Sequence, residues 1–264
     1  MIKKKSIVDV RATILQNRCI SKNVNIITLD CPEIAATAKP GNFVNIKIND
    51  TTQPLLRRPF SIHNVQENTI QIMVKSIGCS TTLLCNTGSG TTMMVLGPLG
   101  KGFTTSGHNF STAILISGGI GSAPMLFLEK TLIAKGKKVI NLIGSQTKEE
   151  LLDLGLTNAL FATNDGSLGF KGNVVELLQN ELPALGNKKI LKIFACGPNS
   201  MLKALAKFCR ENLLSCEVSV ESMMGCGIGI CYGCSIAIKN PDGEIKTVLL
   251  CKEGPTIDAE RLVL

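Results

Sequence analysis

Four of the eleven cysteines in this 264-residue chain lie near its C-terminus, in a spacing that restricts how that segment can fold. Cys226, Cys231 and Cys234 stand close together, and Cys251 follows after sixteen intervening residues. C-x4-C-x2-C with a distant fourth cysteine is typical of a plant-type 2Fe–2S cluster. Four thiolates can reach two iron ions only if the backbone wraps closely, and interleaved glycines permit such a loop. The pattern therefore predicts a compact 2Fe–2S module.

A structural zinc site is the alternative for the same thiols. Zinc is usually held by paired C-x2-C knuckles, and four residues separate Cys226 from Cys231. That gap is too wide for a knuckle. The spacing favours the 2Fe–2S cluster, although cysteines that only pack in a core are a further alternative.

The rest of the sequence indicates a reducing compartment for these thiols. The basic start at residues 1–5 runs into further charged residues and not into the apolar segment of a secretory signal. The apolar runs are far shorter than the roughly 20 residues that cross a bilayer. An odd number of cysteines also argues against a disulfide framework. We therefore expect a cytoplasmic protein with no membrane partner.

The net charge of +8 raises the question of nucleic acid. Basic clusters such as Arg57-Arg58 and Lys188-Lys189 are dispersed, and none alternates with aromatic residues. Such charge is usually a solvated surface. We expect no nucleic-acid partner, and we expect the positive charge to favour anionic cofactors.

The first hundred residues contain short segments that alternate in polarity or are rich in β-branched residues. Turn signals such as Pro40-Gly41 and Asn49-Asp50 separate them, which is typical of antiparallel strands. The segments are 13–15, 24–29, 43–48 and 70–75. Their spacing predicts a small antiparallel barrel.

After Thr112 the pattern changes to strands separated by amphipathic segments. We expect strands at 113–116, 139–143, 159–163, 190–195 and 217–220, and helices at 122–135, 148–154, 173–182 and 198–212. This alternation predicts a parallel α/β sheet. The whole chain is thus predicted to be an α+β multidomain protein, with an antiparallel β-barrel over 1–103, a parallel α/β domain over 104–215 and a cluster module over 216–264.

Two turns carry residues suited to anionic cofactors. Arg57-Arg58-Pro59-Phe60-Ser61, which we place at the end of a barrel strand, offers an arginine fork for a diphosphate and a hydroxyl for a ring heteroatom. Gly118–Pro124 follows a strand and opens a helix, so a pyrophosphate can approach its backbone. This turn lacks both the G-x-G-x-x-G spacing and the acidic residue of a standard Rossmann fingerprint.

A third turn, Phe194-Ala195-Cys196-Gly197-Pro198, also joins a strand to a helix. Ligands bind at the C-terminal edge of a parallel sheet, so Cys196 is a candidate for facing a nicotinamide. A buried thiol at a strand end is the alternative. His63 and His108 stand alone in the sequence and are assigned no catalytic role.

The order of these motifs resembles the ferredoxin reductase superfamily. The chain carries R-P-F-S, then G-G-I-G-S-A-P, C-G-P and the C-terminal C-x4-C-x2-C…C. More closely, it resembles the electron-transfer subunits of NAD-dependent (type B) dihydroorotate dehydrogenases over essentially its whole length. Pro40–Val44, Gly97–Phe103 and Thr163–Gly169 also carry this resemblance.

The resemblance implies three sets of binding residues. FAD would be held by Arg58, Pro59, Phe60 and Ser61, by Met73, Val74 and Lys75, and by Ser80 and Thr81. NAD would meet Gly119, Gly121, Pro124, Asp165, Gly197 and Pro198, with Cys196 as the catalytic group beside the nicotinamide. Cys226, Cys231, Cys234 and Cys251 would bind the 2Fe–2S cluster. Ser80 replaces a glycine usual in the family, and the gap before Cys251 is slightly unusual.

The resemblance also implies a function and a partner. Electrons from dihydroorotate would reach the FMN of a separate catalytic subunit and pass through the cluster and FAD of this chain to NAD, in pyrimidine biosynthesis. The resemblance implies a heterotetramer with two copies of each subunit. The chain offers no candidate base for deprotonating dihydroorotate, which fits a separate catalytic subunit.

Two other functions stay open at this point. The flavin subunits of NADH-dependent ferredoxin:NADP reductases and of sulfide dehydrogenases are similar, but typically carry an aspartate at the first ligand position, where this chain has Cys226. A different class is an iron–sulfur redox sensor in which the α/β domain binds nothing.

Overall fold

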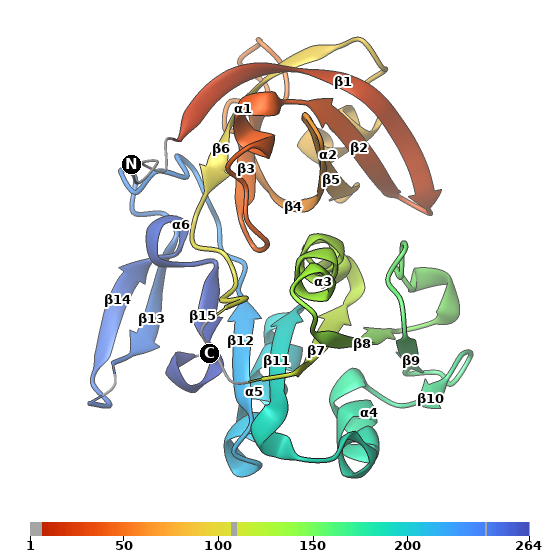
Figure 1. The fold of residues 1–264 in the computed structure, drawn as a ribbon. Helices are drawn as coiled ribbons and strands as arrows, with labels where there is room; N and C mark the ends of the chain where they lie inside the picture. The colour runs from red at the N-terminus through yellow and green to blue at the C-terminus, as the bar shows by residue number, and fades with distance from the viewer. Residues whose placement is uncertain (1–6, 107–109, 241, 264) are drawn as a thin grey trace.

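The chain folds into a barrel that sits above one edge of a mixed sheet, with a small C-terminal module beside them (Figure 1). The computed structural model describes residues 7–106, 110–240 and 242–263. His108 therefore lies outside the described residues. Within these ranges no helix has the length and apolar character needed to cross a membrane.

The barrel is closed, as the sequence predicts. Its strands follow the order β1-β2-β5-β4-β3-β6, and every neighbouring pair is antiparallel. The strands are β1 (Val8–Ser21), β2 (Val24–Asp30), β3 (Phe43–Lys47), β4 (Arg58–Gln66), β5 (Thr69–Lys75) and β6 (Thr92–Leu99). Two short helices, α1 (Pro32–Ala35) and α2 (Cys79–Cys85), follow β2 and β5. Alternate side chains such as Val44 and Ile46 fill the interior.

The segment Arg58–Ser61 differs from its predicted position. It begins β4, whereas the sequence analysis placed it at the end of a strand. The strand runs on from Ser61 through Ile62, which is fully buried in the barrel core, to Gln66, because it pairs with β5 over Ile62–Gln66 with a register shift between Ile62 and Asn64. The residues of the motif are half-buried, and the next three are buried. The outer surface is consequently open only over the first half of β4.

The second domain is a sheet with the strand order β10-β9-β8-β7-β11-β12-β15. All pairs are parallel except β12 with β15. The parallel strands are β7 (Thr112–Gly118), β8 (Lys138–Ser145), β9 (Ala159–Thr163), β10 (Phe170–Lys171), β11 (Leu191–Cys196) and β12 (Ser215–Ser219). The helices are α3 (Met125–Ala134), α4 (Val174–Glu181) and α5 (Asn199–Glu211). The arrowheads of β11 and β12 point toward the barrel (Figure 1), so the ligand-binding edge of the sheet faces it.

One predicted helix in this domain is wrong. Residues 148–154 form only a single 3-10 turn, η2 (Lys148–Glu150), and the chain is extended again at Leu151. Leu152 then packs in an apolar cluster that also contains Val24 and Met73 of the barrel. Because Leu152 packs against the barrel, residues 151–154 do not continue as a helix. Other short turns lie at η1 (Gly119–Ser122), η3 (Leu182–Leu185) and η4 (Lys188–Ile190).

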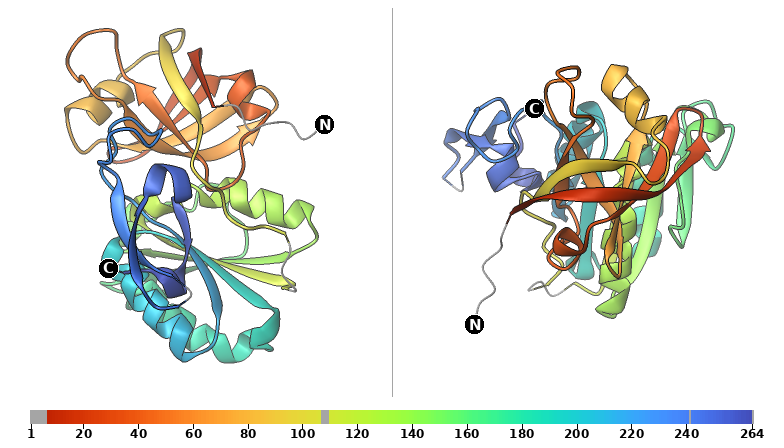
Figure 2. Two further views of the ribbon diagram at one scale, coloured as in Figure 1. Left: turned by 90° about the vertical axis from the view of Figure 1, so that its left-hand side faces the viewer. Right: turned by 90° about the horizontal axis from the view of Figure 1, so that it is seen from above.

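The C-terminal module is joined to both domains. It contains the hairpin β13 (Ser235–Lys239) and β14 (Ile245–Leu249), then α6 (Leu250–Glu253), β15 (Thr256–Asp258) and η5 (Ala259–Arg261). β15 adds an antiparallel strand to the edge of the sheet, which the sequence analysis missed. Figure 2 shows the module beside the sheet, with the loop between β12 and β13 reaching the barrel.

The linker between the barrel and the sheet is held by the C-terminal module. The Thr256 hydroxyl donates to the carbonyl oxygens of Lys101 and Gly102, both at 2.9 Å. The backbone N–H of Lys101 donates to the Gly254 carbonyl. These bonds fix the chain at the point where it leaves the barrel.

A buried ion pair anchors the same linker to the sheet. Lys192 Nζ lies 2.7 Å from Glu217 Oε1 and also donates to the Thr104 carbonyl at 3.1 Å. The other carboxylate oxygen of Glu217 accepts the Thr104 N–H at 2.8 Å. The Lys192 side chain is 2% exposed. Burying a charge without its partner is costly, so each side chain depends on the other.

Replacing Lys192 with methionine should lower the free energy of unfolding by about 3 kcal/mol, because it leaves the Glu217 carboxylate unpaired. Thermal and denaturant unfolding measure this. The matched control is Lys207→Met, which removes an exposed pair with Glu211 at 3.9 Å and should cost less than about 1 kcal/mol. Equal losses in the two variants would contradict the role of the buried pair.

Candidate functional site

The loop between β12 and β13 directs backbone N–H groups at cysteine sulfurs. Cys226 Sγ accepts the N–H groups of Ile228 at 3.5 Å, Ile230 at 3.3 Å and Cys231 at 3.4 Å. Burial of Cys226 acts to raise the pKa of its thiol, but these hydrogen bonds outweigh it and lower the pKa to about 6. The loop therefore favours a thiolate at this position, as a metal ligand requires.

The four candidate ligands lie as two pairs. The N–H of Cys226 donates to Cys231 Sγ at 3.5 Å, and the N–H of Cys251 donates to Cys234 Sγ at 3.5 Å. Burial and the neighbouring Cys234 raise the pKa of Cys251 to about 12. Among the described residues, no three side chains of His, Cys, Asp or Glu are grouped as ligands of one ion. Two pairs of thiols fit a two-iron cluster, in which each iron takes two cysteines.

The loop between β12 and β13, called the cluster loop below, packs against the outer face of the barrel. Gly227 has a φ of +73°, and a Cβ there would lie 3.0 Å from both Asn45 Nδ2 and Leu99 Cδ1. Asn45 Nδ2 donates to the Gly225 carbonyl at 3.1 Å. Only glycine permits this close approach in a left-handed conformation.

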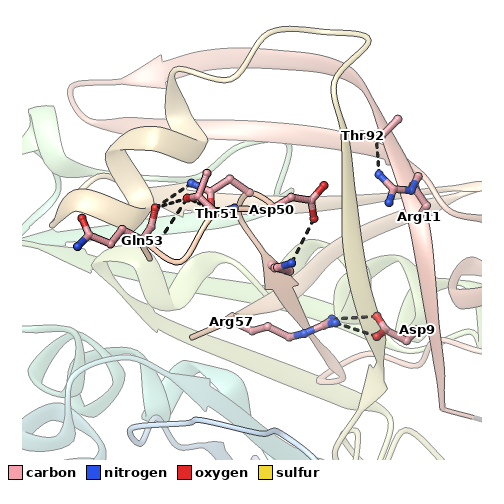
Figure 3. Close-up of polar contacts among 9 residues, drawn as sticks. Asp9, Arg11, Asp50, Thr51, Gln53, Arg57 and Thr92 are labelled. Carbon is pink, nitrogen blue, oxygen red and sulfur yellow. Dashed lines mark hydrogen bonds and ion pairs between the residues drawn. The ribbon is translucent and has the colours of Figure 1, made fainter. Parts of the chain in front are cut away.

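The two arginines at the start of β4, Arg57 just before it and Arg58 as its first residue, have different environments. Arg57 forms a two-pronged ion pair with Asp9 of β1, at 2.9 and 2.7 Å (Figure 3). Arg58 donates to the Leu56 carbonyl at 2.8 Å and to the Arg57 carbonyl at 3.2 Å. The predicted fork is therefore divided: Arg57 is neutralised by a carboxylate, whereas Arg58, beside Pro59, Phe60 and Ser61, bonds to backbone carbonyls.

The remaining candidate FAD residues lie on β5 and α2. Val74 is fully buried in the barrel core, so only its backbone can face a ligand. Met73 is buried against Ser122 of the glycine-rich turn, with Oγ to Sδ at 3.9 Å, whereas Lys75 is exposed. Ser80 is buried within α2. The Thr81 hydroxyl accepts the N–H groups of Ile77 and Gly78 and donates to the Gly78 carbonyl.

A cavity of about 530 Å³ opens at the C-terminal edge of the parallel strands. It is lined by Gly119, Gly121, Gly197 and Pro198 of the predicted NAD site, and also by Lys75. Pro124, Asp165 and Cys196 are not part of the lining. Asp165 is exposed and bonds to Ser167, whose hydroxyl and N–H lower the pKa of the Asp165 carboxyl.

Several lining residues were missed by the sequence analysis. They share positions just after the ends of parallel strands or in the helices that follow, and they include Ser145, Gln146, Glu150, Asn164, Ser200, Met201 and Glu221. Asn164 Nδ2 donates to Gln146 Oε1 at 2.9 Å across the cavity wall. The ends of the predicted strands were the signal that pointed to this edge, but not to individual side chains.

Cys196 is enclosed behind the cavity. It is 2% exposed and pairs across the sheet with Ser117 and Ser219. Burial, followed by the charge of Glu221, raises the pKa of the Cys196 thiol to about 12, against a hydrogen bond from Ser219. A Cβ on Gly121 would collide with the Cys196 carbonyl oxygen, so the glycine-rich turn rests directly on the end of β11. The thiol is therefore neutral.

His63 joins the two domains, although it stood alone in the sequence. Its ring is 2% exposed and Nδ1 donates to the Ala123 carbonyl of the glycine-rich turn at 2.6 Å. Nε2 has no partner within the described residues. Burial lowers the pKa of His63, and the nearby Lys130 adds to this against the hydrogen bond to Ala123. The neutral ring thus ties β4 to the predicted nucleotide turn.

Comparison with known proteins places relatives across the whole chain. The family described as the iron-sulfur cluster binding domain of dihydroorotate dehydrogenase B matches residues 221–263. The dihydroorotate dehydrogenase B (NAD(+)) electron transfer subunit of Desulforamulus reducens is 34% identical over 96% of this chain and 97% of its own. The subunit of the same name from a Geobacillus species is 35% identical, with the same coverage.

A solved structure shares the arrangement of all three parts. An NADH-dependent reduced ferredoxin-NADP oxidoreductase, studied for flavin-based electron bifurcation, superposes with a TM-score of 0.81 and 26% identity. The match covers 95% of this chain and 88% of that one.

Replacing His63 with leucine should weaken NADH binding by about fivefold, equivalent to about 1 kcal/mol, because the buried Ala123 carbonyl loses its donor. Titration of anaerobic protein with NADH measures the affinity, and the flavin content should not change. His63→Asn places an N–H at the position of Nδ1 and should restore most of the affinity. An unchanged affinity in the leucine variant would show that the bond does not position the turn.

Proposed function

This chain belongs to the electron transfer subunits of dihydroorotate dehydrogenase B (NAD(+)), and we propose that it carries electrons from the FMN of its catalytic subunit to NAD. Relatives about 35% identical over nearly the full length establish the family. It is an NAD-linked oxidoreductase subunit that acts with a partner catalytic subunit, and its cofactors are FAD, a 2Fe–2S cluster and NAD. Its place is in pyrimidine biosynthesis.

One observation carries the proposed route. The outer face of two neighbouring barrel strands touches both other parts of the chain: Asn45 of β3 bonds to Gly225 beside Cys226, and His63 of β4 bonds to Ala123 of the nucleotide turn. The open first half of β4 lies next to both contacts. A flavin on this surface would stand between the cluster and the nicotinamide.

The donor sets support each assignment. Cys226 and Cys231, with Cys234 and Cys251, would supply the four thiols of a 2Fe–2S cluster. Arg58, Pro59, Phe60 and Ser61 supply an unneutralised guanidinium and a hydroxyl for FAD, with Met73, Val74, Lys75, Ser80 and Thr81 along the neighbouring strand and helix. Gly119, Gly121, Gly197 and Pro198 line the cavity for NAD, and Pro124 and Asp165 flank it in sequence.

The bound cofactors supply one-electron transfer at the cluster, two-electron hydride transfer at the nicotinamide, and a flavin that connects the two. The protein fixes their positions and electrostatics. N–H groups directed at Cys226 stabilise negative charge on the sulfur. Arg58 offsets diphosphate charge. Cys196, being buried and neutral, acts by shape behind the nicotinamide site and not as a nucleophile.

The cluster loop is also the proposed face for the catalytic subunit. Three large apolar side chains project from or beside it, with Met223 87% exposed, Ile230 72% and Tyr232 69%. Such a patch next to a redox centre suits a protein interface. We assign the FMN-containing catalytic subunit to this face, in a heterotetramer with two copies of each chain. The free thiols, including exposed Cys19 and Cys79, support a cytoplasmic location.

The three functional parts are proposed to be residues 1–103 for FAD, 104–215 for NAD and 216–264 for the cluster. The last boundary falls at the start of β12, and β15 returns to the sheet. The cluster part is thus continuous with the NAD domain in space. The ferredoxin:NADP reductase alternative is less favoured, because Cys226 occupies its aspartate position and full-length relatives carry the dihydroorotate dehydrogenase name.

The isolated chain should oxidise NADH with an artificial electron acceptor but should not oxidise dihydroorotate. None of the residues assigned to FAD is a carboxylate or a histidine that could take the proton from dihydroorotate, so we assign proton removal to the partner. Adding the catalytic subunit should restore NAD-dependent orotate formation. Orotate formation by this chain alone would refute the assignment, and a protein without flavin would favour the redox sensor.

Cofactor content tests the modular assignment. Arg58→Ala should reduce bound FAD several-fold and leave the iron content unchanged, because Arg58 is the free cation of the pair. Arg57→Ala is the matched control and should retain FAD, since its charge is neutralised by Asp9. Cys231→Ser should remove the cluster and keep the flavin. Loss of both cofactors in both Arg58→Ala and Cys231→Ser would contradict separate sites.

A further inference from the structure

Asn45 lies in the barrel between β4, which carries the proposed FAD residues Arg58–Ser61 and is called the flavin strand below, and the loop that carries Cys226. It lies in β3 opposite Pro59 of β4 and Leu96 of β6. Its neighbours Val44 and Ile46 point into the barrel core, so its side chain points outward. Although it is on the outer face, it is fully buried, because the cluster loop covers it.

The side-chain amide of Asn45 makes one hydrogen bond within the described residues. Nδ2 donates to the Gly225 carbonyl at 3.1 Å, and Oδ1 has no partner among the described residues. A buried, unpaired acceptor is destabilising, and an apolar side chain of similar size would avoid it. The contact with Gly225 is the interaction that only the amide provides.

Each of the two residues in this hydrogen bond lies next to a proposed cofactor site. Gly225 precedes Cys226, whose sulfur receives three N–H groups from the loop. The Asn45 carbonyl accepts a bond from Arg57 at 3.3 Å, and Arg57 adjoins Arg58 of the flavin strand. Gly227 leaves room for no side chain against Asn45. The cluster loop therefore packs against β3, which pairs with β4.

We propose that Asn45 is a positioning residue for electron transfer between the cluster and FAD, a role that rests on the proposed function. By holding Gly225, it sets where the first ligand lies relative to β4 and keeps the loop N–H groups directed at Cys226. Without it, the loop would lose its anchor. The distance between the redox groups would increase, and fewer N–H groups would stabilise negative charge on the sulfur.

The test compares Asn45→Leu and Asn45→Ser with the unmodified chain, each purified anaerobically at full length. Leucine keeps the volume without the donor, and serine is too short to reach Gly225, so serine decides the outcome if leucine does not fold. Asn64→Leu is the matched control. Asn64 is a buried barrel amide whose hydrogen bonds within the described residues go to Gln71 and Lys130.

In rapid mixing with NADH, flavin bleaching in the Asn45 variants should stay within about twofold of the unmodified chain. The following reduction of the cluster should slow by about tenfold, as a small misplacement of reacting groups can produce. Redox titration should give a more negative cluster potential, and the electron paramagnetic resonance spectrum of the reduced cluster should change. Asn64→Leu should leave all of these unchanged.

Cluster reduction and potential equal to those of the unmodified chain in a folded Asn45 variant would overturn the proposal. A slowing of flavin bleaching by the same factor would also overturn it, since the defect would then lie upstream. An unmodified chain that binds no flavin or no cluster would instead refute the proposed function, and this inference with it.

Discussion

The structure depends on the outer face of the barrel, where two buried side chains bond to the two other parts of the chain. Asn45 holds the cluster loop and His63 holds the glycine-rich turn. Electron and hydride transfer both require short, fixed separations. A barrel with a closed ladder is rigid enough to serve as the common reference for both contacts.

The linker and the C-terminal strand restrict the remaining freedom between domains. Thr256 bonds to the linker carbonyls, and Lys192 with Glu217 holds the same linker from the sheet side. β15 extends the sheet past β12. The cluster module is consequently tied to the sheet at its end and to the barrel at its beginning, so it cannot swing as a separate domain.

Features with a local physical cause were predictable from the sequence. The closed barrel follows from alternation, the parallel sheet from strands separated by helices, and the cysteine loop from its spacing. Features that depend on residues distant in sequence were not predictable. Residues 148–154 are not a helix because Leu152 packs on the barrel. Arg57 has the local appearance of half an arginine fork, but Asp9 neutralises it.

His63 and Asn45 show the same limit within the candidate site. A lone histidine and an asparagine in a strand carry no local signal, because their partners lie sixty and 180 positions away. The cavity-lining residues after β8 and β12 were likewise hidden, since the sequence indicates strand ends but not which side chains converge there. Asp165 and Pro124 do not line the cavity, whereas Asn164 and residues 118–121 of the same two loops do.

Two glycine-rich segments, the turn at 118–124 and the loop between β12 and β13, are held in place by close approach of their backbones to a strand. A Cβ on Gly121 would strike the end of β11, and one on Gly227 would press on Asn45 and Leu99. At each position, the absence of a side chain lets the loop rest directly on a strand. Glycine costs conformational entropy on folding, and the strand contact that offsets this cost lies within the sheet domain for Gly121 and between the loop and the barrel for Gly227. The position of the loop around Gly227 therefore depends on the barrel, whereas the position of the turn around Gly121 depends on its own sheet.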